Sequence, residues 1–355
     1  MNQDNQSYHQ QLYIDQTLRL REMLRTLPPF AKDYFRSIEP HTSAKTRISY
    51  AYDIRVFFNF LLNENPAYRS YTMQDFRVTD LDKVTSLDIE EYLEYLKVYR
   101  NDPDSKVMTN TEKGLARKMS SLRSFYAYYF KMQMIKTNPT VLVEMPKLHE
   151  KAIIRLEPDE VASLLDLIEK GSETLKGQAL AYHKKTKQRD LAIATLLLGT
   201  GLRVSECVGL DLGDVDFKNN SVKVVRKGGN EMIVYFGGEV EKALKNYIEG
   251  DRKKIVPQKG HENALFYSLQ RKRMGVQAVE NMVKKYAIQV TPNKHITPHK
   301  LRSTYGTTLY KETGDIYLVA DVLGHKDVNT TRKHYAAIDE NRRRQAAGVV
   351  QLREN

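Results

Sequence analysis

Six side chains in the second half of this 355-residue chain could together carry out phosphoryl transfer. They are two arginines, a lysine, two histidines and a tyrosine, in segments that combine basic or polar groups with backbone breaks: Arg203, Lys227, His299, Arg302, His325 and Tyr335. Two fixed guanidinium groups can bind the nonbridging oxygens of a phosphodiester bidentately. No acidic cluster that could hold Mg²⁺ accompanies them in the sequence, so the arginines would replace the metal. The pattern predicts transfer to a protein hydroxyl without any cofactor.

Taken singly, these residues have ordinary structural explanations. Arg203 in "GTGLRVSE" follows a glycine-terminated helix, and Glu206, three residues on, could form a surface ion pair with it. Lys227 in "RKGGN" falls at the tip of a strand reversal, where a solvated charge is common. A histidine at a helix end, like His325, and a tyrosine in a basic helix, like Tyr335, are also common. Only their combination favours a shared site.

The segment "HITPHKLRSTYGTTLY" carries the strongest local signal. Pro298 can begin a helix whose first turns place His299 and Arg302 on one face, since they are three residues apart. Backbone donors, an imidazole and a guanidinium would then surround an anion. A zinc pair from His295 and His299 is the competing interpretation. Pro298 separates the two histidines, and no further ligand is close in sequence, so we disfavour it.

The first 140 residues have the apolar spacing of amphipathic helices. The clearest patterns span residues 45–62, 86–100 and 114–135, the second with a cap at Ser86 or Asp88. Basic side chains on the polar faces are candidate DNA contacts, although a solvated helix face explains each nearly as well. These candidates are Arg47, Arg55, Arg117, Lys118 and Arg123.

The chain divides into a helical domain at residues 1–145, a linker at 146–155 that contains a proline, and a second domain at 156–355. Helices are expected over 158–170 and 189–201, with Gly199 and Gly201 ending the latter. Alternation at Val222, Val224, Ile233 and Tyr235 around "RKGGN" predicts a small antiparallel sheet. The expected fold is mainly α with this small sheet, arranged as a two-domain clamp.

The composition favours a polyanionic partner. Lys and Arg total 56 against 44 Asp and Glu, which gives a net charge of +12 and a pI of about 9.4. Nucleic acid is the first expectation and an anionic membrane face the second. The sequence contains no run of 18 apolar residues and no signal-peptide pattern, so we expect a cytoplasmic protein without membrane insertion. The single Cys207 is expected to be a buried small hydrophobe.

These segments resemble the tyrosine recombinase (phage integrase) family over nearly the whole chain. The helical first part resembles the family's DNA-grasping core-binding domain, and residues 150–355 resemble its catalytic domain. "TGLRVSE" is similar to the family's first arginine box, "HKLR" to its histidine–arginine box and "LGH" to its second histidine box. The resemblance implies that Arg203 and Arg302 bind the scissile phosphate and that Lys227 protonates the departing 5′ oxygen.

The resemblance also implies roles for the remaining three side chains. Tyr335 would attack to form a 3′-phosphotyrosyl link, while His299 and His325 would assist through proton transfer and phosphate hydrogen bonds. Two departures from the family pattern stand out. Many members have a second histidine where this chain has Ser303, and the interval from His325 to Tyr335 is one residue longer than in many relatives.

Within the family, the chain looks most like the Xer type that acts as a single recombinase. That likeness implies double-stranded DNA with a dif-like site, a homotetramer on two duplexes, a tail at 338–355 that docks on a neighbouring protomer, and control by an FtsK-type DNA translocase. The alternatives are an integrase or transposase of a mobile element, a type IB topoisomerase-like enzyme, and a DNA-binding protein without catalysis.

Overall fold

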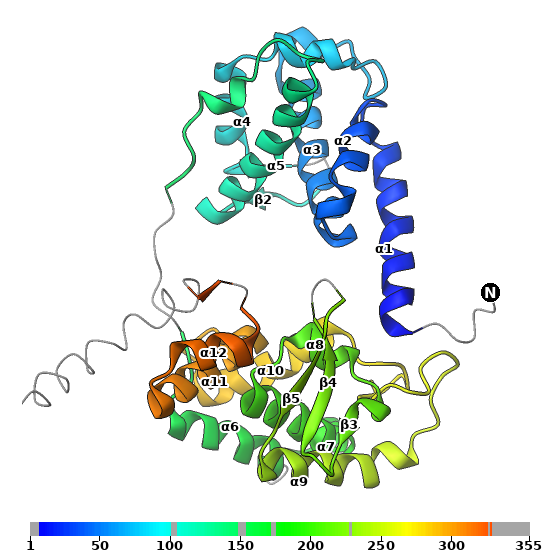
Figure 1. Cartoon of the computed structure of the whole chain (residues 1–355), viewed down its shortest axis with the longest axis vertical. Helices are drawn as coiled ribbons and strands as arrows, with labels where there is room; N and C mark the ends of the chain where they lie inside the picture. Colours follow the sequence, from blue (N-terminus) through cyan, green and yellow to red (C-terminus); the bar gives the residue numbers. More distant parts are fainter. Residues whose placement is uncertain are drawn as a thin grey trace, which may run out of the picture. The chain divides into compact units, whose positions relative to one another are not determined.

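The computed structural model describes residues 7–100, 105–147, 154–171, 175–226, 229–325 and 327–328. The chain forms two compact units, Met1–Lys151 and Ala152–Asn355, which are drawn in Figure 1. Each unit buries its own hydrophobic core, as expected for a separate domain. Within the described ranges, no helix has the length and apolar character needed to cross a membrane.

Helices packed around aromatic side chains make up most of the first unit. Phe58, Phe125 and Tyr129 meet edge to face in its core, with 5.0 Å between the ring centroids of Phe125 and Tyr129. In chain order the elements are α1 (Tyr8–Arg25), α2 (Ala31–Ser37), η2 (Glu39–His41), α3 (Ala44–Glu64), η3 (Pro66–Tyr68), η4 (Val78–Lys83), α4 (Ser86–Tyr95), β1 (Val98–Tyr99), β2 (Met108–Thr109), α5 (Glu112–Lys131) and η5 (Pro139–Val141).

Two details of this unit differ from the sequence expectation. The cap of α4 is Thr85, whose hydroxyl accepts from the N–H of Asp88 while the Asp88 carboxylate accepts from the N–H of Thr85. Strands β1 and β2 form a short antiparallel ribbon, so the unit is not wholly helical. Each strand has only two residues, and both residues of β2 are exposed. Strands this short show no apolar alternation that the sequence could reveal.

The second unit places the apolar helix α7 at its centre. Its residues Ile193, Leu196 and Leu197 are fully buried among α6, α9 and α11. The elements in order are α6 (Pro158–Lys170), α7 (Gly177–Thr200), α8 (Val204–Gly209), η7 (Leu212–Asp214), β3 (Val215–Asp216), β4 (Ser221–Val225), β5 (Glu231–Tyr235), α9 (Gly238–Glu249), η8 (Arg252–Lys254), α10 (Val276–Val290), α11 (Pro298–Thr313) and α12 (Ile316–Leu323).

The predicted sheet is present, with strand order β3-β4-β5 and antiparallel pairing throughout. Val222 pairs with Val234 across β4 and β5, and these two residues are buried. The alternating residues of the second strand, Ile233 and Tyr235, are exposed. Cross-strand partners lie on the same face of a sheet. Because Val234 pairs with the buried Val222, its neighbours Ile233 and Tyr235 lie on the opposite, exposed face.

Helix α7 ends at Thr200, and Gly201 forms its cap with a φ of 64°. A Cβ at Gly201 would overlap the Tyr305 ring and lie 2.8 Å from Leu323. Gly201 therefore lets the end of α7 approach α11 and α12 closely. Gly199 does not help to end the helix, contrary to expectation; it lies inside α7 against Val240.

Cys207 lies fully buried in the core of the second unit, which confirms the expectation for it. Burial is the main cause that raises the pKa of its thiol to about 12. The protonated thiol acts as a small apolar side chain in the packing of α8.

Replacing Gly201 with alanine is expected to lower the free energy of unfolding by about 1–3 kcal/mol, because the left-handed backbone and the crowded position both disfavour a Cβ. Urea denaturation of the full chain measures the change. Gly213→Ala is the matched control, since a Cβ there would meet nothing within 4 Å. Equal stability of the two variants would contradict the role given to Gly201.

Candidate functional site

Arg203 is held at the start of α8 by Glu206. The N–H of Arg203 donates to Oε2 of Glu206 at 2.9 Å, and its Nη1 donates to Oε1 at 2.8 Å. The ion pair expected between these residues is therefore confirmed. Glu206 is buried, whereas 37% of the Arg203 side chain is exposed. One buried carboxylate thus fixes both the backbone and the guanidinium of a partly accessible arginine.

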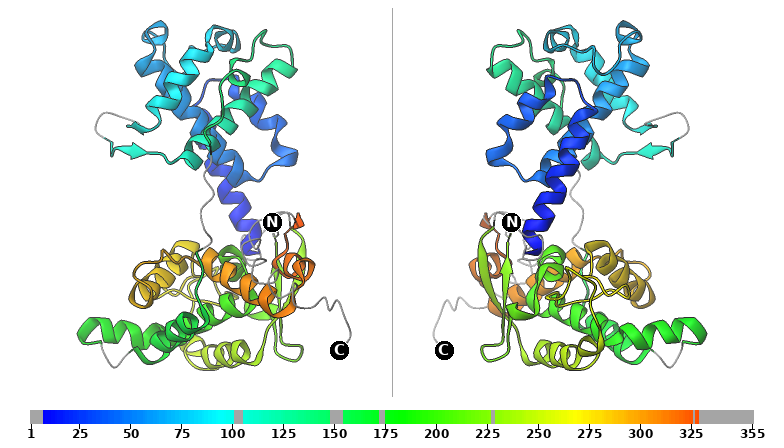
Figure 2. Two further views of the ribbon diagram at one scale, coloured as in Figure 1. Left: turned by 90° about the vertical axis from the view of Figure 1, so that its left-hand side faces the viewer. Right: turned by 90° about the vertical axis from the view of Figure 1, so that its right-hand side faces the viewer.

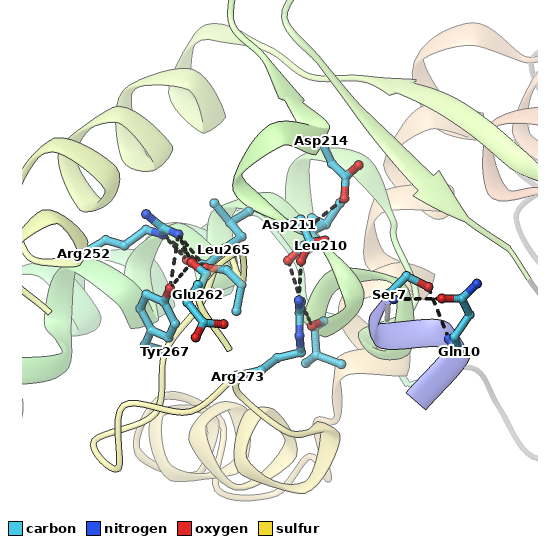
Figure 3. Close-up of polar contacts among 12 residues, drawn as sticks. Ser7, Gln10, Leu210, Asp211, Asp214, Arg252, Glu262, Leu265, Tyr267 and Arg273 are labelled. Atoms are coloured by element: carbon cyan, nitrogen blue, oxygen red, sulfur yellow. Dashed lines mark hydrogen bonds and ion pairs between the residues drawn. The ribbon is translucent and has the colours of Figure 1, made fainter. Parts of the chain in front are cut away.

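The other end of α8 is held by Arg273, which Figure 3 shows reaching toward Leu210 and Asp211. Its Nη1 donates to the carbonyls of Val208 at 3.1 Å and Leu210 at 2.7 Å, and its Nη2 pairs with Asp211. An arginine therefore satisfies backbone carbonyls that the end of the helix leaves without partners.

The loop beside this helix end is held by Arg252 (Figure 3). Its Nε donates to the carbonyl of Leu265 at 3.1 Å, and its guanidinium lies 5.1 Å from the ring centre of Tyr267. The N–H of Leu265 in turn donates to the carbonyl of Leu210 at 3.0 Å. The C-terminal end of α8, opposite to Arg203, is thus held by contacts of residues that lie outside the sequence motifs.

Arg302 joins the ends of two other helices. Thr297 caps α11, and Pro298 is its first residue, as the sequence predicted. Arg302 is only 4% exposed; its Nη1 donates to the carbonyl of Gly201 at 2.6 Å, and its Nη2 donates to the carbonyl of Leu323. This buried cation therefore sits between the end of α7 and the end of α12.

A third arginine reaches the same helix end from the sheet. Arg226 directly follows β4, and its Nη2 donates to the carbonyl of Val322 at 2.8 Å. Sequence reasoning treated "RKGGN" as a turn and assigned no role to Arg226. Nothing in the sequence signals this contact, because it joins residues 96 positions apart.

Three guanidinium groups therefore converge on three successive carbonyls at the end of α12. Arg226 binds Val322 and Arg302 binds Leu323, while Nη2 of Arg203 lies 3.4 Å from the carbonyl of Gly324. The strands of the β4–β5 hairpin and the helix α12 lie on the same side of the second unit in both views of Figure 2. The negative end of a helix favours cations, and cations held close together favour an added anion.

The remaining candidates are placed as follows. His325 is half-buried just after Gly324, and its N–H donates to the carbonyl of Ala320 at 2.9 Å. His299 is exposed in the first turn of α11. Lys227 and Tyr335 lie outside the described residues. Among the residues that are described, no three His, Cys, Asp or Glu side chains are grouped to hold a metal ion.

Two of the basic residues proposed to contact DNA are buried in the first unit. Lys118 is 3% exposed, and its Nζ lies 3.1 Å from Oδ1 of the fully buried Asp53. Arg47 is also buried, and its Nη1 lies 2.7 Å from Oε1 of Glu39. The hydrogen bond from Arg47 is the largest cause that lowers the pKa of Glu39. Lys118 thus has a buried carboxylate partner, whereas Glu39, the partner of Arg47, is 53% exposed. The burial of the two cations disfavours their contact with DNA, which stays a prediction.

The other three candidates also make intramolecular contacts. Arg117 pairs with both carboxylate oxygens of Asp53 but keeps half of its side chain exposed. Arg123 donates to the carbonyl of Thr140 at 3.1 Å and so ties α5 to the segment that follows it. The guanidinium carbon of Arg55 lies 5.4 Å from the ring centre of Tyr52. Contact of these three with DNA stays a prediction.

Comparison with known proteins shows similarity along most of the chain. Residues 154–342 match the phage integrase family. The chain is 33% identical over 330 residues to tyrosine recombinase XerC of Caldanaerobacter subterraneus subsp. tengcongensis, covering 90% of this chain and 86% of that protein.

Solved structures share the fold at lower identity. The recombinase XerH bound to palindromic difH substrate superimposes with a TM-score of 0.62 at 17% identity, covering 86% of this chain and 80% of that one. The Tn1549 transposon integrase in complex with circular intermediate DNA gives a TM-score of 0.61 at 20% identity, covering 85% and 93%. The mainly helical fold with a small antiparallel sheet is confirmed.

Replacing Lys118 with methionine is expected to lower the free energy of unfolding by about 2 kcal/mol, because Asp53 loses a buried charged hydrogen bond. The slope of log affinity against log salt concentration should stay unchanged if Lys118 contacts no phosphate. The loss of one phosphate contact would reduce that slope by about 1. Lys113→Met, at an exposed position of the same helix, should change stability by about 0.5 kcal/mol or less. A reduced salt slope for Lys118→Met alone would show that Lys118 contacts DNA.

Proposed function

The chain belongs to the phage integrase family of tyrosine recombinases, and we propose that it is a site-specific recombinase of the XerS type, which resolves chromosome dimers at a dif-like site. Tyrosine recombinases cut and rejoin DNA through a phosphotyrosine intermediate, and this chain is an enzyme of that kind. The observation that carries the catalytic part of the proposal is the convergence of Arg203 and Arg302 on the end of α12, next to His325.

The two arginines differ in how exposed they are and in what holds them in place. Arg203 offers a partly exposed guanidinium held in place by Glu206. Arg302 supplies a buried charge whose position is set by the carbonyls of Gly201 and Leu323. Charge grows on the nonbridging oxygens during attack, and cations fixed beforehand stabilise it without reorganisation. We assign both arginines to the scissile phosphate.

The proposed reaction conserves protons and phosphoester bonds. The Tyr335 oxygen forms a bond to phosphorus as its phenol proton passes to one of the two histidines, and the bond from phosphorus to the 5′ oxygen breaks. The 5′ oxygen takes a proton from Lys227, which acts as the general acid. A free tyrosine has a pKa of about 10, so neighbouring cations and a base must favour its phenolate.

His299 and His325 are assigned to proton transfer and to hydrogen bonds with the phosphate. Rejoining is the reverse reaction, in which the 5′ hydroxyl of a partner strand attacks the phosphotyrosine. The phosphoester bond is preserved in the intermediate, so the cycle requires no ATP.

The sequence relatives support the Xer assignment. The similarity to XerC extends over 90% of the chain, and a XerD from Staphylococcus epidermidis is 32% identical over 75% of it. The proposed DNA partner is double-stranded DNA with a dif-like site; XerH, which shares the fold, is bound to a difH substrate. We also propose that the chain acts as a homotetramer on two duplexes. An FtsK-type DNA translocase is the proposed regulator. The transposon integrase has a nearly equal TM-score, so the fold does not separate chromosomal from mobile-element recombination.

Replacing Tyr335 with phenylalanine is expected to abolish covalent attachment to DNA while leaving DNA binding intact, because only the attacking oxygen is lost. The substrate is a nicked site whose short strand diffuses away after cleavage, which traps the adduct. Wild type should form the adduct without added metal. Sequencing the DNA recovered on wild-type protein should return one chromosomal site rather than the ends of a mobile element.

Two outcomes would overturn parts of this proposal. An adduct that persists in Tyr335→Phe would refute the nucleophile. Equal relaxation of plasmids with and without the recovered site would instead indicate a type IB topoisomerase-like enzyme.

Replacing Arg203 with lysine is expected to slow strand cleavage by about 10²-fold or more, because one ammonium cannot reproduce bidentate contacts that form in the transition state. DNA affinity should change little, since the contact is one among many. Single-turnover cleavage and a binding titration separate the two effects. Equal losses in affinity and cleavage rate would mean that Arg203 only binds DNA.

A further inference from the structure

A pocket of about 420 Å³ lies in the first unit, between α1, α2 and the start of α3. From α1 it is lined by Thr17, Arg21 and Arg25, and from α2 by Lys32 and Arg36. Residues four apart lie on the same face of a helix, so both helices direct cations toward the pocket. The volume lies within the usual range for sites that bind small molecules.

Positive charge predominates in this pocket. The four cations of α1 and α2 are exposed, and Arg36 pairs with Asp33 at 3.2 Å, which offsets part of the charge. Among the described residues that line the pocket, Glu39 alone is acidic. Like charges held on neighbouring helices repel each other, and an anion bound between them would relieve that repulsion.

The side of the pocket formed by α3 holds a buried cation with an unused donor. Arg47 is 5% exposed, and its Nη1 lies 2.7 Å from Oε1 of Glu39. Its Nε is buried and has no hydrogen-bond partner within the described part of the chain, and the same is true of Oγ1 of Thr17. Buried polar atoms nearly always have a partner, so two such atoms in one pocket lining indicate a place for a polar ligand.

Glu39 is shared by arginines from two helices. The hydrogen bond from Arg47 is the largest cause that lowers the pKa of Glu39, the charge of Arg47 is the next, and Arg21 adds a smaller effect against the opposing effect of burial. Half of the Glu39 side chain is exposed. A phosphate group carries more charge than a carboxylate and can bind guanidinium groups bidentately, so it could compete with Glu39 for these cations.

The lining also contains apolar side chains. Leu20 and Phe35 are buried, and Leu24 is partly exposed. A bare phosphate would make no use of them, whereas an organic group attached to the phosphate would be removed from water against them. The combination of cations with an apolar surface therefore favours a phosphorylated organic molecule over an inorganic anion.

We propose that this pocket binds a free nucleotide, whose phosphates are held by the cations of α1 and α2 and whose base lies against the apolar side chains. The site is separate from the candidate recombination site, since every residue that lines it belongs to the first unit. A ligand that joins α1 to α2 should stabilise the folded protein by mass action.

The test titrates ATP, without metal or DNA, into the full chain by calorimetry. ATP should bind at a single site and raise the midpoint of thermal unfolding. Inorganic triphosphate, which lacks the base, should bind about tenfold more weakly because it buries no apolar surface. Arg21→Ala and Lys32→Ala should each weaken ATP binding about tenfold, as expected for the loss of a charged hydrogen bond. Both residues are exposed, so the variants should fold.

Two pairs of variants separate the pocket from net charge. Glu39→Gln should raise ATP affinity about threefold, because a competing negative charge is removed while the amide oxygen can still accept from Arg47. Glu22→Gln makes the same change in charge at an exposed position of α1 outside the pocket lining, and Arg19→Ala is the equivalent control for Arg21→Ala. Both controls should stay within about twofold of wild type.

Three results would refute the site. ATP might fail to bind, or the control variants might change its affinity as much as the pocket variants do, which would show a response to net charge alone. Weaker ATP binding in Arg203→Lys, with no effect of Arg21→Ala, would instead place the ligand in the second unit.

Two further results would refute the identity of the ligand. Equal affinities for ATP and triphosphate would show that the base makes no contact. If duplex DNA displaces ATP, and Arg21→Ala and Lys32→Ala lose duplex affinity, then the occupant is a phosphate of the DNA backbone rather than a free nucleotide. Strand cleavage is not measured in any of these experiments, so their failure leaves the proposed recombinase function unaffected.

Discussion

The candidate site depends on the C-terminal end of helix α12. A helix leaves its last carbonyls without partners, and here the carbonyls of residues 322–324 are met by Arg226, Arg302 and Arg203. Arg226 comes from the β4–β5 hairpin, Arg302 from α11 and Arg203 from the start of the short helix α8. One helix end therefore fixes three elements that are far apart in sequence. Glu206 forms an ion pair with Arg203, and three guanidinium groups held at one helix end favour an added anion such as a phosphate.

Positive charge is used differently in the first unit. Lys118 is buried against Asp53, and Arg47 is buried with a partner, Glu39, that is itself half exposed, so neither cation is available at the surface. Pairs of this kind gain Coulomb energy at the expense of desolvation, which makes them sensitive to the loss of either partner. The net charge of +12 therefore predicts a polyanionic partner but does not say which cations meet it.

The sequence predicted those parts of the molecule that depend on local chemistry. Pro298 at a helix start, the glycine-rich reversal after β4 and the pairing of Arg203 with Glu206 all follow from neighbouring residues. Long-range contacts left no such pattern. Periodicity could not show that Arg226 reaches α12, because that contact depends on tertiary packing. The burial of Lys118 and Arg47 was missed for a similar reason: helical spacing places a charge on a helix face but does not reveal which neighbours pack over it.

The structure of the wild-type protein trapped on a nicked DNA site tests the central claim most directly. The account predicts a phosphate joined to Tyr335, with guanidinium nitrogens of Arg203 and Arg302 about 2.7–3.2 Å from its nonbridging oxygens. It also predicts that the end of α12 still borders the phosphate. A phosphate bound to another residue, or one held away from both arginines, would contradict it.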